Sequence, residues 1–172
     1  MIKDEKEVFK TRLFTVKRVV LSMPDGKSRN YDLVDIQNAV TILPIDEDGR
    51  VYFVKQFRIG SRSELLELPA GKIELDEDPQ ITAERELREE TGMAAKSMVH
   101  LGNFYMSPGY ATEYMYSFLA RGLYHSPLAP DLDEFLNIVK IPLPEVRRMV
   151  GEQIIEDSKT LAVLALAEKY LR

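Results

Sequence analysis

Three glutamates of one predicted helix are spaced so that their side chains share a face. In the segment 83–92, AERELREETG, Glu86, Glu89 and Glu90 stand at positions i, i+3 and i+4, and each residue turns an α-helix by about 100°. Neighbouring carboxylates repel each other unless cations neutralise them. Hard oxygen ligands of this kind suit Mg²⁺ or Mn²⁺, which commonly act on phosphate substrates. The spacing indicates a divalent-cation site, whereas charge patterning alone more often marks a solvated helical face.

The negative charge of the chain is concentrated around this helix. The 172 residues carry 23 Lys and Arg against 28 Asp and Glu, a formal net charge of −5. Residues 64–90 hold ten acids and three bases, whereas the rest of the chain holds 18 acids and 20 bases. This distribution argues against binding nucleic acid or an anionic membrane by bulk charge. It favours an anionic ligand that arrives together with divalent cations.

The glutamates belong to a longer motif. Gly71 is followed after five residues by Glu77, and after seven more by the segment 85–87, Arg-Glu-Leu. The pattern G-x5-E-x7-R-E-U-x-E-E-x-G-U, where U is a bulky apolar residue, is matched at every position and ends at Gly92 and Met93. At residue frequencies of about 5–7% each, a chance match is far below one in a million. The chain therefore resembles the Nudix hydrolase family strongly.

The resemblance implies a loop–helix–loop site for Mg²⁺, with Mn²⁺ as a substitute. Carried over residue by residue, Glu86 and Glu90 are metal ligands, and Glu89 is a further ligand or supports the other two. The backbone carbonyl of Ala70 completes the site. Four residues are implied to be structural within the motif: Gly71, Glu77, Arg85 and Gly92. We expect Gly71 to permit a tight loop before the helix.

The segments that flank the motif look like the ADP-ribose pyrophosphatase branch of the family, which includes nucleoside diphosphate sugar hydrolases. The stretch 66–71, LELPAG, precedes the motif, and Ser-Pro-Gly at 107–109 follows it. In this branch Arg58 is implied to bind the diphosphate, and Glu67 to support the metal site or the substrate. The implied sugar-binding residues are Pro108, Gly109 and Glu113. Taken alone, Arg58 fits a surface ion pair equally well, and Pro108-Gly109 fits a simple turn.

The general base of the reaction is expected in a late acidic loop. The family commonly shows D-E-D-E before a strand, and residues 131–134 here read Asp-Leu-Asp-Glu. Leu132 breaks the pattern, so one expected acid is missing. Glu134 is the first candidate and Asp133 the second, although each fits a solvated loop acid nearly as well. Glu89 serves as the base in other branches and is the remaining catalytic candidate.

The composition excludes several other classes of protein. The absence of Cys rules out disulfides, zinc–thiolate sites and cysteine nucleophiles. Two histidines disfavour a serine–histidine triad or a two-histidine metal site. The charged N-terminus lacks an apolar signal core, and the longest apolar run, 161–167, is too short to span a bilayer. We expect a cytoplasmic protein.

The elements that must position these residues are mainly strands, with one central helix and helices at the end. Strands are predicted over 11–23, 29–36, 40–45, 51–57, 65–68, 98–106, 113–120 and 135–141. The first two form a hairpin around Pro24-Asp25-Gly26. Helices are predicted from an Asp78 N-cap to a Gly92 C-cap, over 143–151 and over 158–171, and a polar loop over 122–134. This order favours an α+β fold with a mixed sheet.

The resemblance adds expectations about domains and partners. It implies a Nudix-type α/β/α sandwich with a mixed central sheet over residues 38–172, preceded by a small N-terminal β-hairpin or sheet over 1–37. In the ADP-ribose branch a similar small sheet is exchanged between subunits, so a homodimer is expected.

The implied function is Mg²⁺-dependent hydrolysis of the diphosphate bond of ADP-ribose or a related nucleoside diphosphate sugar, giving a nucleoside monophosphate and a sugar phosphate. The motif holds only metal and diphosphate, so hydrolysis of GDP-mannose or another nucleotide sugar is the first alternative. The second, from a different class, is a Nudix-type module that binds a ligand without catalysis. Such modules usually carry a degraded motif, whereas every motif carboxylate is present here.

Overall fold

A computed structural model describes residues 1–129 and 136–171. The chain forms two compact units. The N-terminal unit consists of Met1–Asn38 and Phe104–Tyr114, and the main unit of Ala39–Asn103 and Met115–Arg172. Residues 104–114 thus belong with the first strands of the chain, although they are far from them in sequence. The predicted domain boundary between residues 37 and 38 stays a prediction.

The N-terminal unit contains a separate antiparallel sheet in the order β1-β2-β3. The strands are β1 (Ile2–Lys10), β2 (Phe14–Ser22) and β3 (Ser28–Ile36). β2 and β3 pair in continuous register from Phe14 opposite Ile36 to Ser22 opposite Ser28. The turn between them contains Gly26 with a φ of 79°, a left-handed conformation that favours glycine. The predicted hairpin is confirmed.

Strand β1 was not expected from the sequence. It reads IKDEKEVFK, in which charged residues outnumber apolar ones and no alternation marks a buried face. All nine of its residues are exposed. Backbone pairing with β2 and cross-strand charge pairs, such as Lys17 with Glu5 at 2.9 Å, hold it in place. Such a strand depends on its neighbour and leaves no periodic signal in its own sequence.

The main unit is built on a mixed sheet in the order β10-β5-β4-β9-β8, with β6 beside β5 and β7 beside β4. The strands are β4 (Ala39–Ile45), β5 (Arg50–Arg58), β6 (Ser63–Glu67), β7 (Ala70–Lys72), β8 (Met93–Tyr105), β9 (Tyr114–His125) and β10 (Asn137–Pro142). β4 runs parallel to β9 and antiparallel to β5 and β7. The expected mixed central sheet is confirmed.

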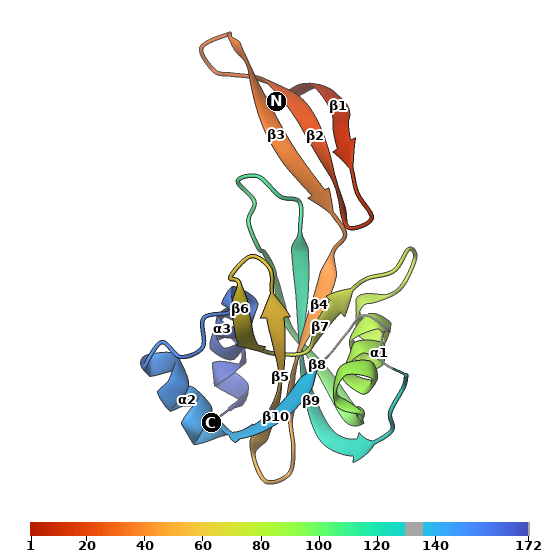
Figure 1. Ribbon diagram of the computed structural model, residues 1–172, viewed down its shortest axis with the longest axis vertical. Coiled ribbons are helices and arrows are strands. Elements are labelled where there is room, and N and C mark those ends of the chain that lie inside the picture. The colour runs from red at the N-terminus through yellow and green to blue at the C-terminus, as the bar shows by residue number, and fades with distance from the viewer. Residues whose placement is uncertain (130–135, 172) are drawn as a thin grey trace. The chain divides into compact units, whose positions relative to one another are not determined.

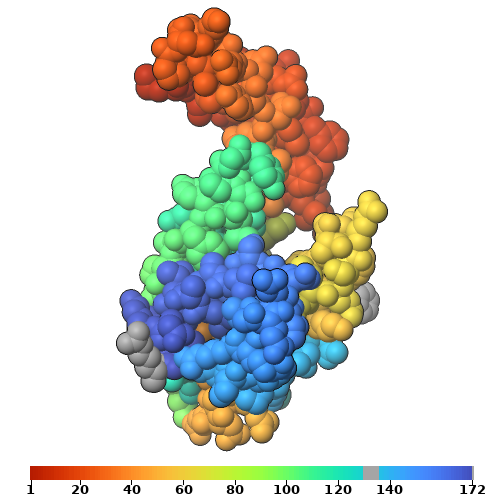
Figure 2. Space-filling model, turned by 90° about the vertical axis from the view of Figure 1, so that its left-hand side faces the viewer, coloured from red at the N-terminus to blue at the C-terminus, as the bar shows by residue number. Residues whose placement is uncertain are grey.

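Helices cover both faces of this sheet. Figure 1 shows α1 (Pro79–Thr91) on one side, and α2 (Leu143–Gly151) and α3 (Ser158–Ala167) on the other. A short 3₁₀ turn, Glu168–Tyr170, follows α3. In Figure 2 the blue residues of the C-terminal part of the chain, which include α2 and α3, form one continuous surface. The α+β class and the three-layer arrangement are therefore confirmed.

The core of the main unit fixes how α1 lies on the sheet. One buried cluster joins Ala83 and Leu87 of α1 to residues of β4 and β9: Val40, Ile42, Phe118 and Ala120. Every residue of β4 is buried, as expected for a central strand covered on both faces. Because Ala83 and Leu87 fix which side of α1 faces the sheet, they also fix the position of the carboxylates on the same helix.

Several element boundaries differ from the sequence prediction. β8 starts at Met93, directly after α1, and β9 continues to His125 through the start of the predicted loop. α3 ends at Ala167, before the predicted end at residue 171, and its buried residues are Lys159, Thr160, Val163 and Ala167. Leu161 and Leu164 line a groove beside α2. Among the described helices, none combines the length and the hydropathy needed to cross a membrane.

Candidate functional site

Helix α1 is capped at both ends. The Asp78 side chain accepts a hydrogen bond of 2.8 Å from the Gln80 N–H, and Pro79 occupies the first turn. At the other end Gly92 adopts a φ of 71°, and its N–H donates to the Arg88 carbonyl at 3.1 Å. The caps fix the length of the helix, and with it the faces that its glutamates occupy.

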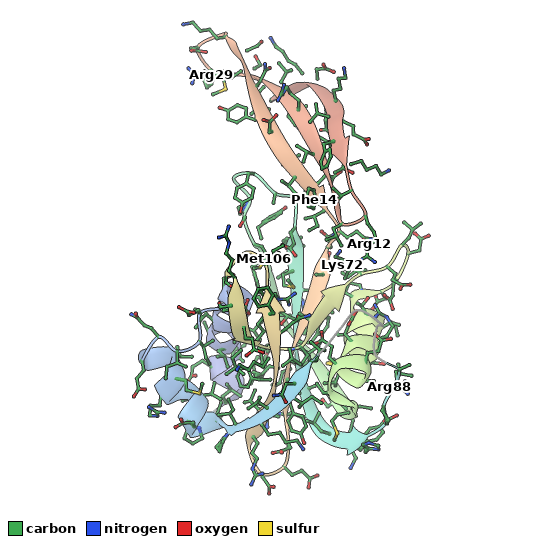
Figure 3. The ribbon with its side chains drawn as sticks, viewed as in Figure 1. Arg12, Phe14, Arg29, Lys72, Arg88 and Met106 are labelled. Carbon is green, nitrogen blue, oxygen red and sulfur yellow. The ribbon has the colours of Figure 1, made fainter. Side chains whose placement is uncertain are left out.

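The outward side of α1 carries different residues. Arg88 projects from the helix away from the sheet (Figure 3). Its Nε donates to the Ser126 carbonyl at 2.9 Å. Glu84 is exposed and accepts a hydrogen bond from Gln80. Both side chains therefore lie off the face that Glu86, Glu89 and Glu90 share.

Glu86 and Glu90 lie on the buried side of α1, next to the short strand β7. They are 8% and 5% exposed. The Ala70 N–H donates to Oε2 of Glu90 at 3.0 Å. A β-carbon added at Gly71 would lie 1.9 Å from Cδ and Oε1 of Glu86, so the Glu86 carboxylate rests directly on the glycine backbone. β7 thereby gathers two of the predicted metal ligands at the backbone of Ala70 and Gly71.

The motif therefore needs glycine at position 71 for a different reason from the expected one. It lies within β7 and not in a tight loop, and its φ is outside the left-handed region. The left-handed residue of the following loop is Asp76, with a φ of 62°. The expected turn is wrong, and the motif needs glycine at this position because any side chain would occupy the space of the Glu86 carboxylate.

Arg85 connects the acidic side chains around the helix. Its Nη1 donates to Glu86 at 2.7 Å and to Glu89 at 2.8 Å, and its Nε and Nη2 each donate to Glu77 at 3.1 Å. Nη2 also donates to the Lys72 carbonyl at 3.2 Å. One guanidinium thus offsets much of the repulsion within the acidic cluster. Its hydrogen bonds lower the pKa of Glu77 to about 2.

The pKa of Glu77 leads to an expected acid sensitivity. Because the folded value of about 2 lies below the ordinary 4.5, ionised Glu77 stabilises the fold above about pH 4.5, and this contribution is lost as the pH falls toward 2. In Glu77→Gln we expect the free energy of unfolding to fall less steeply across this interval. Urea unfolding of both proteins without metal measures the difference. Parallel pH profiles would contradict it, and Glu84→Gln serves as the exposed control.

The carboxylates of the motif are ligands that suit a hard divalent cation, although their oxygens do not yet point to one common position. In residues 1–129 and 136–171, no group of three or more His, Cys, Asp or Glu side chains is arranged to hold a metal ion. Glu86 and Glu89 instead pair with Arg85. The oxygens that come together at β7 are those of the Glu86 and Glu90 carboxylates, and carboxylate oxygens are ligands that Mg²⁺ prefers. The glycine cradle under Glu86 is consistent with a site for such an ion.

Arg58 and Glu67, both predicted to serve the substrate, are joined to each other. Nε and Nη2 of Arg58 donate to the two carboxylate oxygens of Glu67, each at 2.7 Å. Glu67 is only 1% exposed. Burial opposes its ionisation, but hydrogen bonds and charge from Arg58 and Lys159 outweigh it, so the pKa of Glu67 is lowered. Arg58 thus forms an ion pair whose partner is buried and not on the surface, and its role toward a diphosphate stays a prediction.

Sequence reasoning missed the third member of this cluster, Lys159. Its Nζ contacts Oε2 of Glu67 and lies 3.0 Å from Oδ2 of Asp157. The only feature of the sequence that could have indicated Lys159 is its place in the first turn of an otherwise apolar helix, at a position that faces the sheet. That feature identifies a partner only when the strand opposite is known.

The predicted sugar-binding residues lie in the N-terminal unit. Pro108 and Gly109 are exposed, and the residues after them are tied to β3. The Val34 N–H donates to the Tyr110 carbonyl at 2.7 Å, and the Thr112 N–H donates to the Val34 carbonyl at 3.0 Å. Oγ1 of Thr112 accepts from the Ile36 N–H at 2.9 Å.

Glu113 lies in the same loop and is half-buried; its carbonyl accepts from the Met106 N–H at 3.2 Å. The loop is thus anchored to the N-terminal sheet, which the motif does not indicate. The approach of Pro108, Gly109 and Glu113 to the motif carboxylates stays a prediction. The candidates for the general base, Asp133 and Glu134, lie outside the described residues.

Comparison with known proteins decides the family. The profile of the NUDIX domain matches residues 35–161. The protein belongs to the Nudix family. The matched range contains the whole motif, from Gly71 to Met93, and members of this family generally use divalent metals.

The relatives of this Nudix chain align over nearly its full length. An ADP-ribose pyrophosphatase of Bacillus subtilis is 35% identical over 98% of this chain and 93% of its own. A methanol dehydrogenase activator of Bacillus methanolicus is 34% identical, over 99% and 91%. A crystal structure of an ADP compounds hydrolase superposes with a TM-score of 0.89 at 29% identity, covering 99% and 93% of the two chains. The protein is a Nudix pyrophosphohydrolase similar to ADP-ribose pyrophosphatases.

Proposed function

We propose that the protein hydrolyses the diphosphate bond of ADP-ribose or a related nucleoside diphosphate sugar, giving a nucleoside monophosphate and a sugar phosphate, in a reaction that requires Mg²⁺ or Mn²⁺. One observation carries the proposal. The complete motif has Glu86 and Glu90 gathered against β7, in a chain that is 35% identical to an ADP-ribose pyrophosphatase along almost its whole length.

Glu86, Glu90 and the Ala70 carbonyl are the proposed Mg²⁺ ligands, with Glu89 as a further ligand or support. When bound, the ion neutralises diphosphate charge and makes water more acidic. Arg85 orients Glu86 and Glu89 by donating to both, and Glu77 in turn holds Arg85.

The remaining residues act on the substrate and the water. Arg58 donates to diphosphate oxygens and stabilises charge that develops during attack. The general base takes a proton from the attacking water; Glu134 is the first candidate, Asp133 the second and Glu89 the third. Pro108 and Gly109 border the terminal sugar, with Glu113 accepting hydrogen bonds from ribose hydroxyls.

A substrate panel tests this proposal. ADP-ribose, GDP-mannose, NADH and dinucleoside polyphosphates are incubated with Mg²⁺ or Mn²⁺, and products are separated by chromatography. We expect ADP-ribose to have the highest kcat/KM and to yield AMP and ribose 5-phosphate. Preference for GDP-mannose would move the assignment to another nucleotide sugar. Tight ADP-ribose binding without turnover of any compound would favour a non-catalytic ligand-binding module.

The N-terminal sheet is the proposed site of homodimer formation. β1 is exposed along its whole length, and several apolar residues of this sheet and of the turn between β1 and β2 lie open to solvent: Ile2, Val8, Phe9, Leu13 and Tyr31. An exposed three-stranded sheet with apolar side chains commonly meets a partner. Light scattering of the full chain should give twice the monomer mass, and Val8→Glu with Phe9→Glu should shift it toward the monomer. The cytoplasmic location inferred from the sequence stays a prediction.

A further inference from the structure

An ion-pair network with a buried glutamate and a buried lysine lies outside the motif, where α3 meets the end of β6. It contains Arg58, Glu67, Asp157 and Lys159, two cations and two anions. Lys159 is 7% exposed and Glu67 1%. Taking such charges out of water costs free energy, which mutual pairing offsets only when the geometry is good. The burial of Lys159 therefore has a cost, and we ask what its contact with Glu67 of β6 contributes.

Lys159 is itself held rigidly by the first turn of α3. Asp157 caps the helix, because its Oδ2 accepts from the Thr160 N–H at 3.0 Å and from the Thr160 hydroxyl at 2.6 Å. The same oxygen lies 3.0 Å from Nζ of Lys159. The lysine therefore approaches Glu67 from a fixed direction.

Glu67 in turn fixes Arg58. The two hydrogen bonds use Nε and Nη2, which form one edge of the guanidinium group. The other N–H donors lie on its remaining edges, and the Arg58 side chain is 44% exposed. Hydrogen bonding to Glu67 raises the pKa of Arg58, and the charges of Glu90 and Asp157 raise it further. The guanidinium thus lies within electrostatic reach of a motif carboxylate while it still has donors to offer.

A five-residue stretch, Glu67–Gly71, links this network to the motif. The Leu68 N–H donates to Oγ1 of Thr160 at 2.9 Å, and the Pro69 carbonyl accepts from the Ile42 N–H at 2.9 Å. The next two residues meet Glu90 and Glu86 of α1. Each residue of the stretch is therefore tied to a neighbouring element, so α3 and α1 are held from the same short segment.

We propose that Lys159 is a positioning residue, which holds Glu67 from α3 and thereby sets the direction in which Arg58 presents its free donors to the substrate diphosphate. The proposal rests on the proposed role of Arg58 in binding that diphosphate. Without Lys159, the buried Glu67 keeps a single cation, and its carboxylate turns to follow Arg58. A displaced guanidinium then loses alignment with the diphosphate.

Kinetics in a double-mutant cycle test this proposal. Lys159→Met should lower kcat/KM for ADP-ribose by about 10- to 100-fold, since small misplacements of binding groups have effects of this size. Lys159→Arg, which keeps a cation, should restore most of it. In an Arg58→Met background, Lys159→Met should change kcat/KM by less than about twofold, because the residue it positions is gone. Lys169→Met, at an exposed site after α3, is the control. An equal loss with and without Arg58 would overturn the proposal.

Two further measurements distinguish a positioning role of Lys159 from a role in stability alone, and test it independently of the proposed function. Urea unfolding should show that Lys159→Met destabilises both backgrounds, while its kinetic effect appears only with Arg58 present. The NMR signal of the Arg58 Nε–H group should shift and broaden in Lys159→Met and recover in Lys159→Arg. An unchanged signal overturns the proposal. A wild-type protein without hydrolase activity would overturn the proposed function alone, and the Arg58 signal would then decide whether Lys159 sets its position.

Discussion

Replacing Glu86 or Glu90 by glutamine is expected to lower kcat by about a thousandfold, since ligand carboxylates contribute several kcal/mol through the metal. Both carboxylates lie at the β7 backbone, where glutamine has the same shape, and a glutamine at position 90 retains an oxygen that accepts the Ala70 N–H. The substitutions also remove one of three neighbouring negative charges. Because Glu86→Gln also weakens the charge-assisted hydrogen bond from Arg85, we expect the Tm without metal to stay close to the wild-type value.

The metal dependence of stability gives this prediction a second readout. Mg²⁺ or Mn²⁺ should raise the Tm of the wild-type protein, because an ion that binds only the folded state stabilises it. The increase should be much smaller in Glu86→Gln and Glu90→Gln. Glu84→Gln on the exposed side of α1 is the matched control and should retain wild-type activity and the same increase. Near-normal turnover in either motif variant would rule out the assigned ligands.

Gly71→Ala is expected to abolish most activity while leaving the fold in place. The added β-carbon would lie 1.9 Å from the Glu86 carboxylate, so one of the two must move. The obstructing atoms are the end of a flexible side chain and not backbone, and moving them costs the fold little. The carboxylate, however, can no longer rest at β7. We expect kcat to fall by about 100-fold, as for a misplaced catalytic group.

The consequences of Gly71→Ala distinguish displacement of Glu86 from a general loss of structure. In the double variant with Glu86→Gln, activity should be no lower than in Glu86→Gln alone, because both changes remove the same carboxylate from the site. Gly151→Ala is the control, since a β-carbon there has no neighbour within 4 Å. Circular dichroism and Tm should be nearly the same for all variants. A Gly71→Ala protein with wild-type turnover would contradict the close contact described here.

The central helix illustrates how far local sequence can specify a site. Asp78 and Pro79 mark the start of the helix and Gly92 marks its end, each by contacts within one turn, and the helix has the predicted ends. Ala83 and Leu87 then face the sheet, and Glu86, Glu89 and Glu90 lie on the predicted side. Because a helix repeats every 3.6 residues, these relations depend on spacing alone. The sequence alone is therefore enough to place the motif on its helix.

Long-range contacts lie beyond this kind of reasoning. Glu67 meets Lys159 across 92 residues of sequence, and Ile36 meets Thr112 across 76. No period or spacing connects such pairs, because the path of the chain between them decides whether they approach. Strand β1 is a similar case, since its stability comes from β2 and not from its own pattern.

The sequence by itself determined the family, the α+β class and the residues of the motif, because each follows from a dense local pattern. Only the tertiary structure decided why those residues are needed. Gly71 proved to be a contact surface for Glu86 and not a turn, and Arg58 proved to be paired with a buried glutamate that a lysine of α3 also holds. The physical reason is that steric contacts and ion pairs form here between elements that are distant in the chain. Neither kind of contact can be recognised from the spacing of residues in one local segment.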